Sequence, residues 1–384
     1  MGDSRFAGKS VAVFSANYLP HLGGVENYTY HLAKEMTLLG ARVSVVTLAC
    51  EGATAGSQID DDGFRVVRLE SRALLGGRYP IARPLRAPQH ALDDEDVDYV
   101  IVNTRFYPQS LSGVVFAQAR GVRPIVIDHG SAHLTLGNPV VDKGVEAVEH
   151  GMTALMKRRP ADYYGVSKRS SEWLSHFGIT SCGELYNSID AVAYAQSASS
   201  RNFRDELGLP RTAPIVSFVG RIIPEKGISS FVDAARRVPG AAFLAAGDGP
   251  LKCELEKTAP SNVFFLGRLR PEDTAALLTQ SSLFCLPTRS EGFATSLLEA
   301  SACKTPSIIT DVGGARELIA DETYGAIVPS ATPEHIARAV QRALDDEVAL
   351  KSMGEAVYTR VRDCFSWRQT ALRALEACDH ANRR

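Results

Sequence analysis

Two glutamates, Glu291 and Glu299, stand eight positions apart where an apolar run gives way to a helix. The run Leu283–Leu286 is typical of a strand buried on both faces, and a loop at 287–292 precedes a helix expected from about Ala294. A phosphate is favoured at such a junction, because the first helical N–H groups lack partners and the helix dipole is positive there. Glu299 lies ~8 Å further along the axis, where its carboxylate could accept hydrogen bonds from a ribose diol. The alternative is a solvated loop glutamate followed by an ordinary amphipathic helix.

Two cations, Arg221 and Lys226, lie five positions apart in a glycine-bounded loop that follows the apolar run Ile215–Val219. A guanidinium offers a planar fork of donors and an ammonium offers a point charge, so together they could clamp a diphosphate. Solvated loop charges are the alternative. The sequence thus supplies two candidate phosphate-binding segments in its second half.

These segments resemble a known family. The paired glutamates, with Gly292-Phe293 after the first, are similar to the motif of glycosyltransferase family 4, and the loop at 220–227 resembles the Gly-Arg…Pro-x-Lys-Gly loop of the same enzymes. Members of this family are retaining enzymes with the GT-B architecture. The resemblance implies that Arg221 and Lys226 neutralise the leaving diphosphate, aided by backbone amides after Glu291, while Glu291 faces the transferred sugar.

Further site residues follow from the same resemblance. His129 ends the apolar segment at 123–128, where it is either a structural hydrogen bonder or, as in the family, a group facing the sugar. The turn at Gly247 is either purely structural or lines the nucleotide pocket, and the backbone near Leu266 and Arg268 would receive the base. The expected catalytic residues are His129, Arg221, Lys226 and Glu291. The expected donor-binding residues are Gly23, Gly24, Gly220, Gly247, Leu266, Arg268, Gly292, Phe293, Ala294, Thr295 and Glu299.

Alternating strands and helices must position these residues. In the first half, strands are expected at 10–15, 41–48, 64–69, 97–103, 123–128, 162–165 and 182–185, with helices at 25–39, 109–120, 140–159 and 167–177. In the second half, strands are expected at 215–219, 242–246, 263–266, 283–286, 307–310 and 326–328, with helices at 228–238, from 271, from 294, and at 333–345, 347–363 and 366–380. This alternation predicts the α/β class with parallel sheets.

The 384 residues suggest two domains at ~150 residues each. We expect an N-terminal Rossmann-like acceptor domain at 1–190, a linker at 191–202 rich in Ala and Ser, and a nucleotide-sugar domain at 203–365. The family resemblance implies that the two domains face each other across a cleft and that a C-terminal helix at 366–384 crosses back to the first. A loop at 76–80 is expected among those that meet the acceptor.

Composition limits the remaining possibilities. A net charge of −2, with 45% apolar and 22% charged residues, is typical of a soluble globular protein and does not support nucleic-acid binding. The seven cysteines form no C-x-x-C pair, which favours a reducing cytoplasm. We find no signal peptide and no apolar run of ~18 residues, so membrane contact is expected to be peripheral. The basic run at 157–159 fits either a helix C-terminus or a membrane-surface patch.

The family resemblance, together with these residues, implies a retaining glycosyltransferase of the hexosyltransferase type. It would transfer a sugar from a nucleotide-diphosphate sugar, UDP-linked by preference and GDP-linked as the second choice, to a hydroxyl of a lipid-linked or cell-envelope glycan precursor. No Asp-x-Asp segment lies in a plausible phosphate site, so we expect neither a metal nor another cofactor. A nucleotide-sugar 2-epimerase and a non-catalytic nucleotide-sugar-binding subunit are the alternatives.

Overall fold

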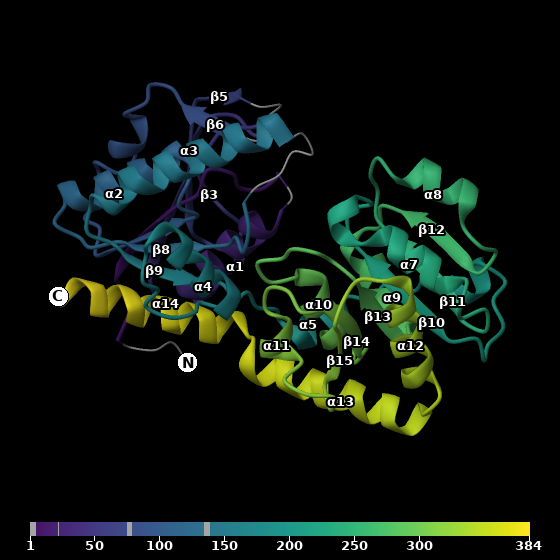
Figure 1. Cartoon of the computed structure of the whole chain (residues 1–384). Helices are drawn as coiled ribbons and strands as arrows, with labels where there is room; N and C mark the ends of the chain where they lie inside the picture. Colours follow the sequence, from purple (N-terminus) through teal and green to yellow (C-terminus); the bar gives the residue numbers. More distant parts are fainter. Residues whose placement is uncertain (1–4, 22, 75–78, 134–138) are drawn as a thin grey trace. The chain divides into compact units, whose positions relative to one another are not determined.

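The computed structural model describes residues 5–21, 23–74, 79–133 and 139–384 (Figure 1). The chain divides into two compact units, one formed by Met1–Asn187 with Trp367–Arg384 and the other by Ser188–Ser366. Each unit is described by itself below. Within the described ranges, no helix is long and apolar enough to cross a membrane.

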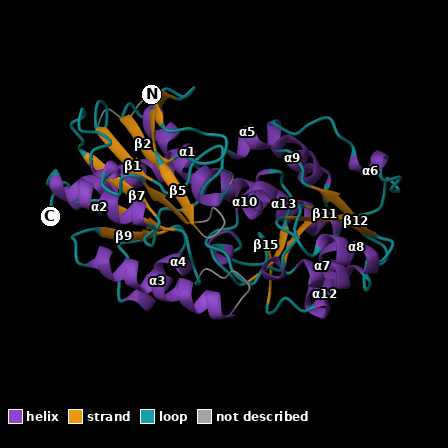
Figure 2. Cartoon of the chain, turned by 90° about the horizontal axis from the view of Figure 1, so that it is seen from above, coloured by secondary structure: helices purple, strands orange, loops and turns teal. Residues whose placement is uncertain are grey.

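The first unit is built on a seven-stranded sheet with the order β3-β4-β2-β1-β7-β8-β9. The strands are β1 (Ser10–Phe14), β2 (Arg42–Leu48), β3 (Gly56–Ile59), β4 (Arg65–Leu69), β7 (Tyr99–Asn103), β8 (Ile125–Asp128) and β9 (Asp162–Gly165). All neighbours pair in parallel except β3, which runs antiparallel to β4. Every residue of β1 and β7 is buried, as expected for parallel strands covered on both faces (Figure 2).

The helices of the first unit include the last one of the chain. They are α1 (Gly24–Leu38), α2 (Pro108–Ala119), α3 (Pro139–Lys157), α4 (Lys168–Leu174) with the 3₁₀ turn η2 (Ser175–Phe177), and α14 (Trp367–Asn382). In Figure 1, α14 lies in yellow among the elements of this unit, and it packs against α1, β7 and β8. The rings of His31 and Trp367 stack at 5.0 Å with a 10° interplanar angle. The prediction that the final helix returns to the first domain is therefore confirmed.

The second unit is built on a six-stranded parallel sheet with the order β12-β11-β10-β13-β14-β15. Its strands are β10 (Ile215–Val219), β11 (Ala242–Ala246), β12 (Val263–Gly267), β13 (Leu283–Leu286), β14 (Ser307–Thr310) and β15 (Gly325–Val328). Its helices are α5 (Ala191–Gln196), α6 (Phe203–Glu206), the 3₁₀ turn η3 (Pro224–Lys226), α7 (Ile228–Ala235), α8 (Lys252–Thr258), α9 (Pro271–Gln280), α10 (Thr295–Ala302), α11 (Ala315–Leu318), α12 (Pro333–Leu344) and α13 (Glu347–Cys364).

Both sheets have the strand order of a Rossmann fold. In the second unit the order reverses between β10 and β13, and in the first unit it reverses between β1 and β7. Ligands of such sheets bind beyond the carboxyl ends of the strands at this switch point. The loops after β10 and β13 carry the predicted phosphate-binding residues, so the topology brings them to one edge of the sheet. The expected α/β class is confirmed.

The prediction of an irregular linker at 191–202 is wrong. Residues Ala191–Gln196 form α5, because the Asp190 carboxylate caps the helix by accepting a hydrogen bond from the backbone N–H of Ala193 (3.0 Å) and the alanine-rich segment has high helix propensity. The helix packs against α10.

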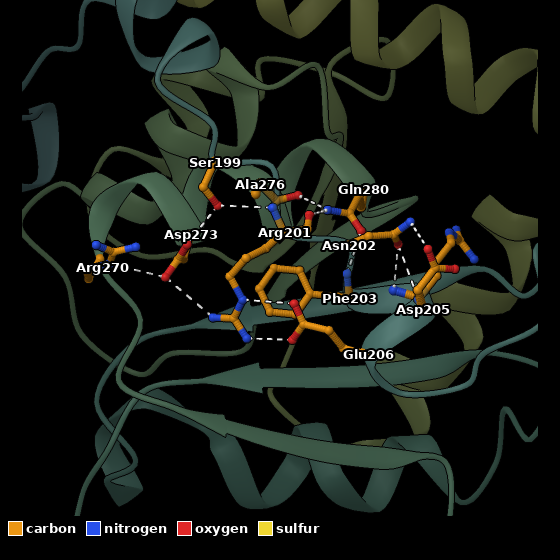
Figure 3. Close-up of polar contacts among 11 residues, drawn as sticks. Ser199, Arg201, Asn202, Phe203, Asp205, Glu206, Arg270, Asp273, Ala276 and Gln280 are labelled. Carbon is orange, nitrogen blue, oxygen red and sulfur yellow. Dashed lines mark hydrogen bonds and ion pairs between the residues drawn. The ribbon is translucent and has the colours of Figure 1, made fainter.

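The residues after α5 are also fixed to the second unit, through α9 (Figure 3). The Ser199 hydroxyl donates to the Asp273 carboxylate (2.7 Å), and the Gln280 amide donates to the carbonyl oxygen of Arg201 (2.8 Å). Arg201 forms an ion pair with Glu206 (2.6 Å), and Phe203 is fully buried. The whole segment at 191–202 therefore belongs to the second unit.

Two further expectations need correction, and one strand was not expected at all. Tyr79–Ala82 is not a loop but the strand β6, which pairs with β5 (Ser71–Leu74); the rest of the predicted loop, residues 76–78, lies outside the described residues. The predicted strand at 182–185 is only a single bridge between Gly165 and Glu184. The strand β3 was not predicted, because all four of its residues are exposed and it shows no apolar alternation.

Candidate active site

The loops after β10 and β13 are in direct contact in the second unit. Gly227 has φ of +70°, and a Cβ atom there would lie 1.9 Å from the carbonyl oxygen of Pro287, so only glycine fits. The backbone N–H of Arg289 and the hydroxyl of Thr288 both donate to the carbonyl oxygen of Glu225, at 2.8 and 3.1 Å. The two predicted phosphate-binding segments therefore form one surface.

A charged pair joins these loops. The Lys226 ammonium donates a hydrogen bond to the Glu291 carboxylate, and the side chains are only 20% and 12% exposed. Arg221, five positions earlier, is exposed, and its side chain makes no hydrogen bond or ion pair with the described residues. A partly buried pair and an open guanidinium suit a site that receives an anion, because the guanidinium is available and the ammonium can be shared.

Glycines bring the neighbouring strand ends close together. Gly247 has φ of +143°, and a Cβ atom there would lie 1.8 Å from the carbonyl oxygen of Gly220. Its backbone N–H donates to the carbonyl oxygen of Gly267 (2.8 Å), between the predicted base-binding residues Leu266 and Arg268. Gly247 thus has a clear structural function in packing three strand ends. Leu266 is half-buried and Arg268 is exposed beside this turn.

Two further glycines support the glutamate loop. Gly313 has φ of +50°, and a Cβ atom there would lie 2.6 Å from the carbonyl oxygen of Gly292, while one at Gly314 would lie 2.3 Å from the Phe293 ring. Sequence reasoning gave this Gly-Gly turn no part in the site. The sequence feature that could have identified this turn is a second glycine pair shortly after the buried strand at 307–310.

The helix α10 begins where the glutamate loop ends. Ala294 is its N-cap residue, with φ −67° and ψ 114°, and no described side chain caps the N–H groups that start at Thr295. Phe293 and Ala294 are themselves buried. An uncapped helix start favours an anion, as the sequence predicts.

Glu299 lies inside α10 beside Tyr194 of α5. Burial raises the pKa of Glu299 to about 7, and the interaction with the Tyr194 hydroxyl opposes that shift. Burial, followed by the nearby charge of Glu299, raises the pKa of Tyr194. Tyr194 was missed by sequence reasoning, because it lies in the segment interpreted as a linker and no spacing links it to Glu299. A desolvated carboxylate of this kind suits a role in accepting ligand hydroxyl groups.

His129 lies at the end of β8 in the first unit and is held by a chain of hydrogen bonds. Its Nε2 lies 3.1 Å from Oδ1 of Asn103, whose amide nitrogen donates to the hydroxyl of Thr29 (2.8 Å). Because Asn103 uses its oxygen toward the histidine, Nε2 carries the proton and Nδ1 has the lone pair. Burial lowers the pKa of His129 to about 3, so the ring is neutral at neutral pH. The edge contact with Tyr28, at 4.7 Å between ring centroids, fixes the ring plane.

The glycine pair of the first unit begins α1. Gly23 is the N-cap residue and Gly24 the first helical residue. A Cβ atom at Gly23 would lie 2.3 Å from a carboxylate oxygen of Glu26, which is buried and bonded to Nδ1 of His21 at 2.8 Å. Gly23 thus leaves room for this carboxylate to lie against the helix start. The predicted residues fall into two groups, with His129, Gly23 and Gly24 in the first unit and the others in the second.

Comparisons with known proteins agree with this arrangement. Residues 23–216 match the model of the glycosyl transferase 4-like domain, and residues 199–360 match the model of glycosyl transferases group 1. A GDP-mannose-dependent monoacylated α-(1-6)-phosphatidylinositol monomannoside mannosyltransferase from Corynebacterium glutamicum is 24% identical over 94% of this chain and 95% of its own.

Two solved structures show the same fold. Sucrose-phosphate synthase from Thermosynechococcus elongatus has a TM-score of 0.73 at 20% identity, covering 97% of this chain and 98% of its own. HepE of Anabaena, solved with UDP and glucose, has a TM-score of 0.72 at 18% identity, covering 97% of this chain and all of its own (100%). With its two Rossmann-like units and its returning C-terminal helix, the chain has the GT-B fold and belongs to the family 4 (group 1) glycosyltransferases.

Proposed function

We propose that this glycosyltransferase transfers a sugar from a nucleotide-diphosphate sugar to an acceptor hydroxyl with retention of the anomeric configuration. The observation that carries the proposal is the ion pair between Lys226 and Glu291, which joins the two loops at the switch point of the second sheet. It provides a cation for the diphosphate and, next to it, a carboxylate for the sugar hydroxyls.

The leaving diphosphate is stabilised by fixed positive charge. Arg221 binds it as a planar fork, Lys226 as a point charge, and the backbone N–H groups from Gly292 to Thr295 complete the site. These groups act where negative charge develops as the glycosidic bond breaks. They take the part that a divalent ion has in other transferases, so we propose that the reaction needs no metal.

The proposed retaining course rests on the resemblance of the paired glutamates, the loop at 220–227 and the returning helix to a retaining family. His129 is neutral, with its Nε2–H committed to Asn103, so its Nδ1 lone pair accepts a hydrogen bond from a sugar hydroxyl. The acceptor then enters on the face that the phosphate leaves, and a phosphate oxygen helps to remove the acceptor proton. No covalent carboxylate intermediate is required. Gly23 and Gly24 allow the backbone to approach the donor.

Glu299 receives the ribose, and the strand ends at Gly247, Leu266 and Arg268 receive the base. A UDP-sugar is our preferred donor. A GDP-sugar is the second choice, which the name of the corynebacterial relative supports.

We propose that the acceptor is a lipid-linked or cell-envelope glycan precursor. The enzyme would be cytoplasmic and would bind this acceptor at the inner face of the membrane. The same relative is named for a phosphatidylinositol mannoside acceptor. The helix α3 also exposes Val141, Val148 and Leu155, spaced seven apart along its surface, and the basic run at 157–159 follows them. Such a face can lie on an anionic lipid surface.

A thermal-shift panel of UDP, GDP, dTDP and ADP, followed by their sugars, tests the proposal. A ligand at 100 times its Kd stabilises the folded protein by about 2.7 kcal/mol, so the preferred base should be evident. Product analysis with the matching sugar separates the alternatives. A 2-epimerase would change the donor sugar without an acceptor, and a non-catalytic subunit would bind the donor without turnover.

A further inference from the structure

Three histidines converge on the surface of the first unit. His133 lies in the segment after β8, His150 on α3 and His176 on the 3₁₀ turn η2. One ring nitrogen from each lies within 4.8 Å of the others. None of the three has a part in the proposed transfer reaction, so their convergence needs a separate explanation.

The spacing of two of these nitrogens fits one zinc ion. Nε2 of His133 and Nε2 of His176 are 3.2 Å apart. Two imidazole nitrogens bound to tetrahedral zinc at about 2.0–2.1 Å lie about 3.3 Å from each other. The rings would therefore need only a small adjustment to share an ion.

The protonation state of His133 also fits a ligand. The Glu149 carboxylate accepts a hydrogen bond from its Nδ1 (2.7 Å), which leaves the Nε2 lone pair available. Glu149 is in turn held by Arg105 (2.6 Å), and their side chains are only 5% and 1% exposed. A buried carboxylate that orients a histidine in this way is the usual outer partner of a zinc ligand.

Aromatic neighbours hold the other two rings. His176 stacks on Trp173 with centroids 4.6 Å apart and an interplanar angle of 4°, and His150 packs 4.8 Å from Phe177. These contacts reduce the conformational entropy that metal binding would otherwise cost. Packing and a hydrogen bond between the His133 and His176 rings would explain that pair, but neither requires a nitrogen of the third ring, His150, to lie within 4.8 Å of both.

We propose that His133, His150 and His176 bind one zinc ion, with the Glu146 carboxylate or a water molecule as the fourth ligand. An oxygen of Glu146 lies 3.6 Å from Nε2 of His133, and its side chain is 46% exposed. The ion would tie together α3, η2 and the segment after β8. Since His133 stands four positions after His129, it would also anchor the far end of the segment that begins at the sugar-facing histidine.

Zinc titration of the metal-free protein tests the site. The full chain is prepared without a histidine tag, stripped with a chelator, and titrated with zinc against a chromophoric competitor. We expect one equivalent to bind per chain and to raise the unfolding temperature. Binding should weaken at acidic pH, because protons compete with zinc for the imidazole nitrogens. Cobalt in place of zinc should give the visible absorption of a tetrahedral site.

Variants assign the ligands. His150→Ala and His176→Ala remove exposed side chains, and each should weaken zinc binding at least tenfold. Glu149→Gln should weaken it by roughly 10- to 100-fold, the range for outer partners. His90→Ala is the matched control, since His90 is an exposed histidine of the same unit that pairs with Asp93, and it should bind zinc like the parent.

Circular dichroism of the metal-free variants checks that they fold. The proposal is overturned if the parent binds no zinc, or if His150→Ala and His176→Ala bind it as tightly as His90→Ala does. Nucleotide binding is measured on the same samples. The zinc result does not depend on it, so the zinc site and the proposed transfer reaction can fail independently.

Discussion

Lys226 and Glu291, 65 positions apart in sequence, form an ion pair that joins the loops after β10 and β13. The Glu291 carboxylate accepts a hydrogen bond from the Lys226 ammonium. A diphosphate that binds between Arg221 and the start of α10 would compete for that ammonium. The pair therefore joins the residue proposed to bind phosphate to the residue proposed to face the sugar.

The two members of this pair should respond differently to substitution. Lys226→Met should weaken binding of UDP or GDP by roughly 1.5–3 kcal/mol, the contribution of a hydrogen bond to a charged group. Glu291→Gln should leave binding of the bare nucleotide unchanged or stronger, because it releases Lys226, yet it should lower turnover. Calorimetry and initial rates check both, with Arg237→Met, an exposed cation of the same unit, as control. Unaltered nucleotide binding in Lys226→Met would argue against the phosphate assignment.

Glu299 should contribute to ribose recognition. At pH 8, above the pKa of about 7 and with the carboxyl ionised, Glu299→Ala should weaken binding of the bare nucleoside diphosphate by roughly 1.5–3 kcal/mol, because hydrogen bonds to a charged group are lost. If calorimetry shows the folded variant binding UDP and GDP as well as the parent does, the ribose assignment is wrong.

The raised pKa of Glu299 also predicts how the stability of the protein depends on pH. Burial raises this pKa from 4.5 to about 7, so its contribution to stability is fully present below pH 4.5 and is lost as the pH rises through about 7. Glu299→Gln removes this dependence. Urea unfolding of parent and variant between pH 4.5 and 8 should show a smaller loss of stability in the variant over that range.

Activity should not require a divalent metal. Turnover should survive excess EDTA, because Arg221 and Lys226 are proposed to supply the positive charge that the leaving phosphate needs. Removal of zinc from the histidine site would lower the unfolding temperature, so rates are measured well below it. Loss of turnover in folded protein, restored by Mg²⁺ or Mn²⁺, would contradict the prediction.

His129 should affect turnover more than nucleotide binding. His129→Ala should lower kcat by roughly two- to tenfold, since one neutral hydrogen bond contributes about 0.5–1.5 kcal/mol. The Kd of UDP or GDP should not change, because the nucleotide is assigned to the second unit. A loss of 10²–10⁴-fold, the range for a general base, would instead indicate that His129 removes the acceptor proton.

Much of the fold could be predicted from local pattern. The strands at 162–165, 215–219, 242–246, 283–286 and 307–310 have the predicted bounds, because buried parallel strands are apolar runs bounded by loop residues. The strand β3 could not be found, since its exposed residues carry no such pattern. The helix α5 was missed because its capping residue, Asp190, was placed at the end of the first domain and the residues after it were interpreted as a linker.

The candidate site was less accessible to sequence reasoning. Residue types and the family resemblance identified the residues, but the contact of Gly227 with Pro287 and the pairing of Lys226 with Glu291 depend on how β10 and β13 lie in the sheet. No sequence pattern indicated Tyr194 or the three-histidine cluster as part of a site. Their members are far apart in sequence and meet only through helix packing.

Retention of configuration is the central claim, and the first product formed from the preferred donor tests it most directly. Slow hydrolysis of an α-linked gluco-configured nucleotide sugar is followed by NMR before the released sugar equilibrates, so that no acceptor need be known. The account predicts an α-configured first product, with the small anomeric proton coupling of that form. A large trans-diaxial coupling would mean inversion, and would contradict both the proposed course of the reaction and the role given to His129.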